Sequence, residues 1–433
     1  MQDNIMHSYT AEEHRKRLLH IREAERGITS CAKRELLSHY EPGHYIYPLS
    51  APGKPEEDEA LFRRLKAGGA SYIYIWSAWA DEANRWNGDP MFVPKNPEEM
   101  KDFIDLVHRC GLKILPYTST NFFNRDSEYF NPDWAYESKY DLILERKPDD
   151  PRPDIRLAHC SPTSPGWRAH LLRQYGNLLD MFDFDGVYID SGYLRRCDYL
   201  SSQRYYEPEP VLVKDEILAF PETADCDGGM EDLLGLIYNE VKHRNKTVTV
   251  FKEGCDRFHT QNTVSDYMFA GECAEDIDFV RETIQSFPHV LLDFSPPEKI
   301  AEDEYYLNTI PFLHFPLLKQ LAITVPDQNS IIPDFEYALR WLSLFREMTE
   351  DGTWCYADAK CPSIVSGDMQ NVVCTFYVNR ESYLVLANFG KQTAKLLLTG
   401  KYREVQPGAG NGKVAGSLEL HGREIKVLKR TDA

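Results

Sequence analysis

Long apolar runs and positive charge are both scarce in this sequence. No stretch of about 18 apolar residues occurs, and the first residues are charged where a secretory signal peptide would need an apolar core. We therefore expect a soluble, cytoplasmic protein. The 49 Lys and Arg residues are outnumbered by 68 Asp and Glu residues, which gives a net charge of -19. Because such a surface repels phosphate backbones and anionic lipids, we expect neither nucleic acid nor a membrane as partner.

The sequence also lacks the common metal and cofactor motifs. Its ten cysteines form no CxxC pair, and its thirteen histidines form no HxH or HExxH arrangement. We interpret the cysteines as reduced thiols and expect no metal site, although His44, His159 and His314 could converge in the fold. No glycine-rich phosphate turn and no strand-Ser-helix elbow are found either. We therefore expect no cofactor.

What the sequence does contain is a regular alternation of strand and helix patterns. Apolar runs typical of buried strands lie at 44–50, 70–79, 112–120, 185–191, 247–254, 265–272, 289–295 and 321–326, of which the first and the last match the pattern least well. Amphipathic helix patterns separate several of them, at 55–69, 96–111, 164–182, 230–245 and 274–287. Eight such units predict a (β/α)8 TIM barrel, with a doubly wound sheet as the alternative.

The pattern changes near residue 352. From Trp354 onward the chain shows short alternating runs separated by Gly, Asn and Pro, which is typical of an antiparallel β-sandwich. We therefore expect three parts, namely an N-terminal helical extension at 1–38, a catalytic barrel at 39–352 and a C-terminal β-sandwich at 353–433.

Candidate functional residues follow from the strands, because the carboxyl ends of the strands build the active site of a (β/α)8 barrel. The strand "VYID" ends in Asp190, and a buried strand that ends in an acid is expected to deliver it to a site. Glu253 and Glu272 stand at the ends of two later strands. The expected substrate-binding residues, mostly aromatic or charged, are Trp76, Trp79, Asp81, Tyr117, Trp134, Lys252, Arg257 and Asp293.

Several carboxylates above aromatic loops suit glycoside hydrolysis, which needs one acid to protonate the leaving oxygen and one carboxylate to attack or to activate water. Each acid also has a structural explanation that stays open. Asp190 could pair with Arg195 or Arg196, Glu253 with Lys252 or Arg257, Glu272 could cap the helix that begins at Ala274, and Asp293 could form a turn.

The barrel portion, roughly residues 40 to 330, resembles the melibiase-type α-galactosidases in three segments. Asp190 in "VYIDSGY" stands where that family has its nucleophile, "EGCDRF" at 253–258 matches a Glu-x-Cys segment followed by Arg-Phe, and Glu272 in "MFAGECAEDID" stands where the family has its acid/base. Three features differ from the family. The glycine run after Cys255 is absent, Tyr188 replaces a Lys two residues before the nucleophile, and Glu272 replaces an Asp.

The resemblance implies a retaining, exo-acting glycoside hydrolase. Asp190 would attack the anomeric carbon and Glu272 would act as acid and then base, with their oxygens roughly 5 to 5.5 Å apart. Trp76, Trp79 and Trp134 would stack on sugar rings. The alternatives are an amylase-like barrel with Glu253 as acid/base and a carbohydrate-binding barrel without catalysis. In each case a carbohydrate is the expected partner, and assembly into a homo-oligomer stays open.

Overall fold

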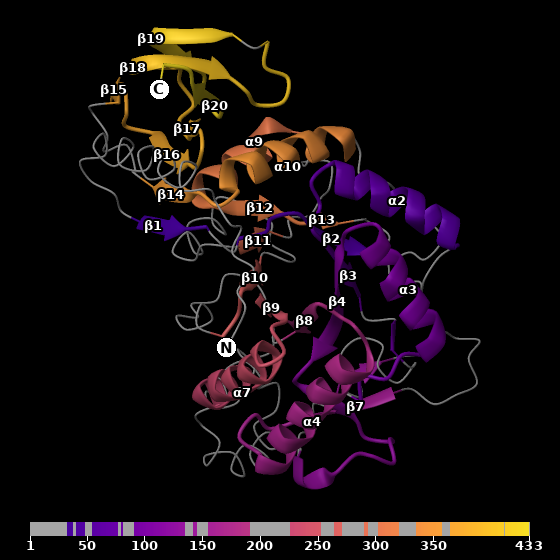
Figure 1. Cartoon of the computed structure of the whole chain (residues 1–433). Helices are drawn as coiled ribbons and strands as arrows, with labels where there is room; N and C mark the ends of the chain where they lie inside the picture. Colours follow the sequence, from indigo (N-terminus) through magenta and orange to yellow (C-terminus); the bar gives the residue numbers. More distant parts are fainter. Residues whose placement is uncertain are drawn as a thin grey trace.

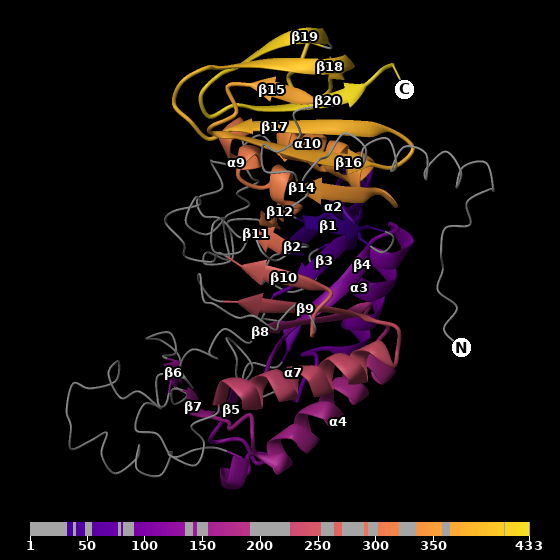
Figure 2. The same cartoon turned by 90° about the vertical axis from the view of Figure 1, so that its left-hand side faces the viewer.

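The computed structural model (Figure 1) describes residues 33–37, 40–47, 54–76, 79–80, 91–134, 142–144, 155–190, 226–252, 264–270, 290–292, 302–319, 335–356, 364–410 and 412–432. Figure 1 shows parallel strands in the centre, with long helices outside them. An antiparallel sheet lies at one end of the molecule in both Figure 1 and Figure 2.

The central sheet is entirely parallel. Its strands are β2 (His44–Tyr47), β3 (Tyr72–Ile75), β4 (Lys113–Ser119), β8 (Gly186–Asp190), β9 (Thr247–Lys252), β10 (Tyr267–Ala270), β11 (Val290–Leu292), β12 (His314–Pro316) and β13 (Leu318–Lys319). The order in the sheet is β12-β11-β10-β9-β8-β4-β3-β2-β13. The first seven of these strands lie in the predicted runs. Because neighbouring strands are parallel, their carboxyl ends share one edge of the sheet.

The last strand segment differs from the prediction. We expected it at 321–326, a run that lies outside the described residues, whereas β12 pairs with β11 and β13 pairs with β2 at residues 314–319. Only Leu317 separates β12 from β13, so the two outermost strands of the sheet are consecutive in the chain. The sequence pattern missed this segment because Pro316 has no backbone N–H and a proline within an apolar run argues against a strand.

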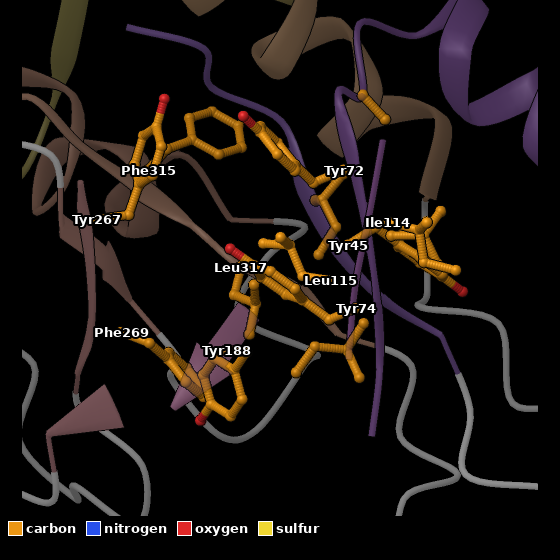
Figure 3. Packing of buried hydrophobic residues seen from close by; sticks show 14 of the residues in the cluster. Tyr45, Tyr72, Tyr74, Ile114, Leu115, Tyr188, Tyr267, Phe269, Phe315 and Leu317 are labelled. Atoms are coloured by element: carbon orange, nitrogen blue, oxygen red, sulfur yellow. The ribbon is translucent and has the colours of Figure 1, made fainter. Parts of the chain in front are cut away.

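The inner face of this sheet is strongly curved. The Tyr74 hydroxyl on β3 lies 3.0 Å from the Thr249 hydroxyl on β9, although β4 and β8 lie between these strands in the sheet. Figure 3 shows the rings of Tyr74, Tyr188 and Phe269 close together, and the centroids of Tyr188 and Phe269 are 5.5 Å apart. Aromatic side chains from distant strands therefore fill the concave side of the sheet.

His44 is part of this interior and is not arranged as a metal ligand. Its ring stacks on Tyr72 at 4.5 Å, and burial lowers its pKa to about 3, so the imidazole is neutral at physiological pH. Nε2 lies 3.1 Å from the Glu41 carbonyl oxygen, which can only accept. Nε2 therefore carries the proton, and Nδ1 accepts from the Tyr74 hydroxyl at 2.5 Å.

The outer helices are α2 (Pro55–Ala67), α3 (Pro97–Arg109), α4 (Pro165–Met181), α7 (Cys226–Lys242), α9 (Asp303–Leu307) and α10 (Phe335–Thr349). Helices are confirmed at four of the predicted positions, and the fifth pattern, at 274–287, lies outside the described residues. The starts of α3 and α4 follow from local chemistry. Proline occupies their first turns, and the side chains of Asn96 and Ser164 accept hydrogen bonds from the backbone N–H groups of Glu99 and Trp167. None of the described helices is long and apolar enough to cross a membrane.

The long connection after β4 has a structure of its own. It contains β5 (Phe122–Asn124), a 3₁₀ turn η3 (Pro132–Trp134), β6 (Leu142–Leu144) and β7 (Ile155–His159). The three strands form a small antiparallel sheet in the order β5-β7-β6. This sheet lies beside the carboxyl end of β4, which leads directly into it.

The second large sheet is antiparallel. It contains β1 (Lys33–Leu36), β14 (Thr353–Tyr356), β15 (Val365–Gly367), β16 (Val372–Val378), β17 (Ser382–Asn388), β18 (Ala394–Glu404), β19 (Lys413–Leu420) and β20 (Ile425–Arg430). Figure 2 shows β18 and β19 in a layer over β16 and β17. Strand β1 falls in the segment that we expected to be helical. That expectation is wrong for these four residues, because pairing with β14 decides the conformation of a short polar stretch.

The strands of this sheet alternate between two environments. Phe376 and Cys374 join an apolar cluster with residues of β17, β18 and β19, whereas Tyr377 and Thr375 face the central sheet. The hydroxyls of Tyr377 and Thr375 donate to the carbonyl oxygens of residues 310 and 311, in the 3₁₀ turn η7 (Ile310–Phe312) before β12. The antiparallel sheet is thus hydrogen-bonded to the segment that leads into the last strand of the parallel sheet.

A histidine at the amino edge of the parallel sheet gives a pH-dependent prediction. His108 Nε2 lies 2.9 Å from Asp185 Oδ2, and this hydrogen bond raises the pKa of His108 above its ordinary value. The folded state therefore favours the protonated imidazole. The resulting stabilisation is complete below the unfolded-state pKa and is lost as the pH rises through the folded-state pKa.

We expect the free energy of unfolding of the wild-type chain to be higher than that of His108→Gln, and we expect this difference to be largest at acidic pH. Glutamine keeps a donor near Asp185 but carries no charge. Urea unfolding of both proteins between about pH 5 and pH 9 measures the difference. A difference that does not change with pH would contradict a role for the charged imidazole.

Candidate functional site

Asp190 is the centre of the candidate site. It is the last residue of β8, and it pairs with Ser119 on one side and Phe251 on the other. It is buried, with 8% of its surface exposed. The hydroxyl of Tyr117 donates a hydrogen bond to Asp190 Oδ2, so the strand end presents a carboxylate that is held by a neighbouring strand.

Tyr117 is held in place from several directions. In the parallel register Tyr117 pairs with Tyr188. Because Tyr188 stands two residues before Asp190, the side chains of Tyr117 and Asp190 lie on the same face of the sheet. Its carbonyl oxygen accepts a hydrogen bond from Trp79 Nε1 at 2.8 Å. Its ring lies 5.1 Å from that of Trp76 and 5.6 Å from that of Tyr188. These contacts fix the direction from which the phenol approaches Asp190.

Trp76 and Trp79 both contact Tyr117, the first through the rings and the second through the Tyr117 carbonyl oxygen. Their surroundings differ from the expected sugar platforms. Trp76 exposes 5% of its surface and Trp79 exposes 3%. Stacking on a sugar requires an open ring face, and these two rings are covered by other parts of the chain.

Trp134 lies in a different cluster. Its ring is 4.5 Å from that of His170 and 5.7 Å from that of Trp167, both on α4. A Cβ atom at Gly166 would come within 2.8 Å of Trp134 Nε1, so the glycine lets the indole approach the first turn of the helix. Trp134 thus packs the connection after β4 against α4, although Trp167 Nε1 links this cluster to the Thr120 carbonyl at the end of β4.

The remaining predicted residues lie mostly outside the described part of the chain. These are Asp81, Glu253, Arg257, Glu272 and Asp293, and Lys252 is described only as the last backbone position of β9, paired with Ala270 of β10. Glu253 follows β9 directly, and Glu272 lies two positions after the end of β10. Both therefore follow strands at the edge where Asp190 lies, and their separation from Asp190 stays a prediction.

One feature of this edge was not predicted from the sequence. The hydrogen bond from Tyr117 to Asp190 joins residues 73 positions apart, and only the strand register brings them together. Asn121 follows β4 by two residues, where the sequence places polar and aromatic residues after a strand. It is 5% exposed, and its side-chain Nδ2 has no hydrogen-bond partner among the described residues.

Within the described ranges, no group of three or more His, Cys, Asp or Glu side chains is arranged to hold a metal ion.

No protein-family model and no curated protein matches the sequence. Solved structures do resemble the fold at 12% identity. A maltogenic α-amylase from Thermotoga neapolitana has a TM-score of 0.55, with 90% of this chain and 98% of the amylase covered. An α-amylase from Geobacillus thermoleovorans, in complex with acarbose, has a TM-score of 0.56 with 90% and 97% covered.

A GH36 α-galactosidase from Geobacillus stearothermophilus, in complex with 1-deoxygalactonojirimycin, is similar at 12% identity and a TM-score of 0.56. The chain shares the fold of these glycoside hydrolases. The match covers 93% of this chain but only 57% of the α-galactosidase, whereas both amylases are covered almost completely. The likeness therefore extends to the glycoside hydrolase barrel as a fold and does not single out the melibiase type.

Proposed function

We propose that this protein is a retaining, exo-acting glycoside hydrolase with Asp190 as the nucleophile. The observation that carries the proposal is the carboxylate of Asp190, buried at the carboxyl end of β8 and held by the Tyr117 hydroxyl. A strand-end carboxylate fixed by a neighbouring strand is suited to attack on a bound substrate. The fold likeness to glycoside hydrolases supports the same class of reaction.

The proposed reaction has two steps. In the first, an Asp190 oxygen attacks the anomeric carbon, the glycosidic C–O bond breaks, and Glu272 protonates the departing oxygen. In the second, Glu272 takes a proton from water, the water oxygen attacks the same carbon, and the ester bond to Asp190 breaks. The sugar leaves with its original configuration, and no cofactor takes part.

The architecture that we propose around this site is a closed (β/α)8 barrel within residues 39–352. Closure is supported by β12 and β13, which pair with opposite edges of the parallel sheet and are separated by one residue. We further propose that residues 353–433 form a β-sandwich, to which β1 adds a strand. Asp81, Lys252, Glu253, Arg257 and Asp293 are proposed to bind hydroxyls or an anionic substituent of the sugar.

A panel of 4-nitrophenyl α- and β-glycosides tests the class of reaction, with the α-galactoside and the α-glucoside as the first two members. We expect hydrolysis of at least one member, with retention of configuration by NMR. A matching 2-deoxy-2-fluoro glycosyl fluoride should label Asp190, as seen by mass spectrometry of the digested protein. A protein that cleaves no member and is not labelled would be a sugar-binding barrel or would serve another function.

The contact between Tyr117 and Asp190 gives a prediction for Tyr117→Phe. The hydroxyl stabilises the ionised carboxylate, so its removal makes Asp190 easier to protonate. We expect the acidic limb of the pH profile of kcat/KM to move up by roughly one pH unit or more. Activity on the hydrolysed aryl glycoside, measured across pH, gives the answer.

Tyr402→Phe is the matched control, because the Tyr402 hydroxyl donates to the Thr399 carbonyl at 3.0 Å in the antiparallel sheet. Tyr402→Phe should leave the acidic limb of the pH profile of kcat/KM unchanged. If Tyr117→Phe also leaves this limb unchanged, the Tyr117 hydroxyl does not affect the protonation of Asp190.

A further inference from the structure

One buried donor close to Asp190 is left without a partner by the described part of the chain. Trp76 exposes 5% of its surface, and its Nε1 atom has no hydrogen-bond partner among the described residues. Three other buried indoles, Trp79, Trp167 and Trp354, donate to backbone carbonyls at 2.8, 3.0 and 3.2 Å. Because a buried N–H that binds nothing is destabilising, the unpaired Nε1 atoms of Trp76 and of Trp341, which lies on α10, each need an explanation.

The position of Trp76 suggests that explanation. It follows the last residue of β3 directly, and its ring contacts Tyr117 at 5.1 Å, Tyr188 at 5.5 Å and Phe269 at 6.4 Å. Tyr117 also binds Asp190, so the indole is joined to the carboxylate through a single side chain.

A second unpaired donor strengthens the case. Asn121 Nδ2 is buried and has no partner among the described residues, and Asn121 lies two residues past the end of β4, the neighbour of β3 in the sheet. Two unpaired donors thus occur where β3 and β4 end. Protein sites that bind hydroxyl groups keep such donors ready for the ligand.

We propose that the indole N–H of Trp76 donates a hydrogen bond to one oxygen of the sugar bound at Asp190. The inference rests on the proposed function and deepens it. An indole N–H can only donate, so its partner is a hydroxyl or ring oxygen of the substrate. The role differs from the stacking that the sequence predicted, because a donor recognises one oxygen of the sugar, whereas a ring face recognises its apolar surface.

Trp76→Phe tests the proposal, since phenylalanine keeps an aromatic ring but has no N–H. On the aryl glycoside that the wild-type chain hydrolyses, we expect kcat/KM to fall about tenfold, mostly through a higher KM. The 3-, 4- and 6-deoxy analogues of that glycoside locate the partner oxygen. One analogue should be a poor substrate for the wild type, and Trp76→Phe should no longer distinguish it from the parent sugar.

Trp354→Phe is the matched control. The Trp354 indole donates to the Pro311 carbonyl oxygen, and both residues are far from Asp190 in the sequence. It should leave KM unchanged and lower the melting temperature more than Trp76→Phe does, because only Trp354 loses a hydrogen bond within the protein. A Trp76→Phe protein with the wild-type KM and the wild-type response to all three analogues would overturn the inference.

Failure of the proposed function gives a different result. If the wild type cleaves no glycoside, saturating D-galactose and D-glucose are tested as ligands by thermal shift. Protection of the wild type that is lost in Trp76→Phe would support the donor role in a binding protein. Equal protection of both proteins, or of neither, would overturn it.

Discussion

Asp190→Asn is expected to lower kcat/KM by about a thousandfold or more while the protein stays folded. The amide cannot form an ester with the anomeric carbon, so the covalent intermediate is lost. An amide oxygen can still accept the hydrogen bond from Tyr117, which preserves the packing around β8. Steady-state kinetics on the hydrolysed aryl glycoside, with circular dichroism to confirm the fold, measure the effect.

The smaller variant Asp190→Ala extends this test. It leaves room for azide, which should attack the anomeric carbon in place of the carboxylate and give a glycosyl azide of inverted configuration. Asp266→Asn serves as the control, because Asp266 precedes β10 at the other edge of the sheet and pairs with Lys242 at 3.0 Å. It should change stability and leave kcat unchanged. Full activity in Asp190→Asn would remove Asp190 from the mechanism.

Glu272→Gln is expected to lower kcat by about 10²- to 10⁴-fold on a glycoside with a poor leaving group. Glutamine cannot donate a proton to the departing oxygen. The loss of kcat/KM, which reports the first step, should be small on a 2,4-dinitrophenyl glycoside, because dinitrophenolate departs without protonation, whereas kcat stays low because the second step still lacks its base. Azide should accelerate the variant and give a glycosyl azide of retained configuration, because Asp190 is still present to form the intermediate.

Glu253→Gln is the natural comparison, since Glu253 follows the neighbouring strand β9. We expect a weaker effect that does not depend on the leaving group, as suits a residue that binds hydroxyls. The reverse pattern would assign the acid/base to Glu253, as in an amylase-like barrel. If Glu272→Gln and Glu253→Gln both remain fully active on glycosides with poor leaving groups, neither glutamate is the acid/base.

The candidate site was partly predictable because strand ends are local features. An apolar run that stops at an acid or an aromatic residue can be recognised without knowledge of its neighbours, which is how Asp190, Tyr117, Trp76 and Trp79 were found. Their contacts could not be predicted. Whether an indole stacks on a ligand, binds a carbonyl or keeps a free N–H depends on which strands lie next to it.

Trp134 is a second residue whose contacts could not be predicted from the sequence. Its position in a long aromatic connection suggested a sugar platform, and its ring instead packs on Trp167 and His170 of α4. Gly166 makes that approach possible, and a glycine in the first turn of a helix has no visible meaning in the sequence until its neighbour is known.

By itself, the sequence determined the alternation of strands and helices, because hydrophobic period, proline and capping side chains act within a few residues. It also fixed which side chains stand at the strand ends. The tertiary structure alone decided that residues 314–319 form β12 and β13, that β1 joins a sheet built by the other end of the chain, and that Tyr117 holds Asp190. Each of these depends on pairing between distant segments, which no local pattern encodes.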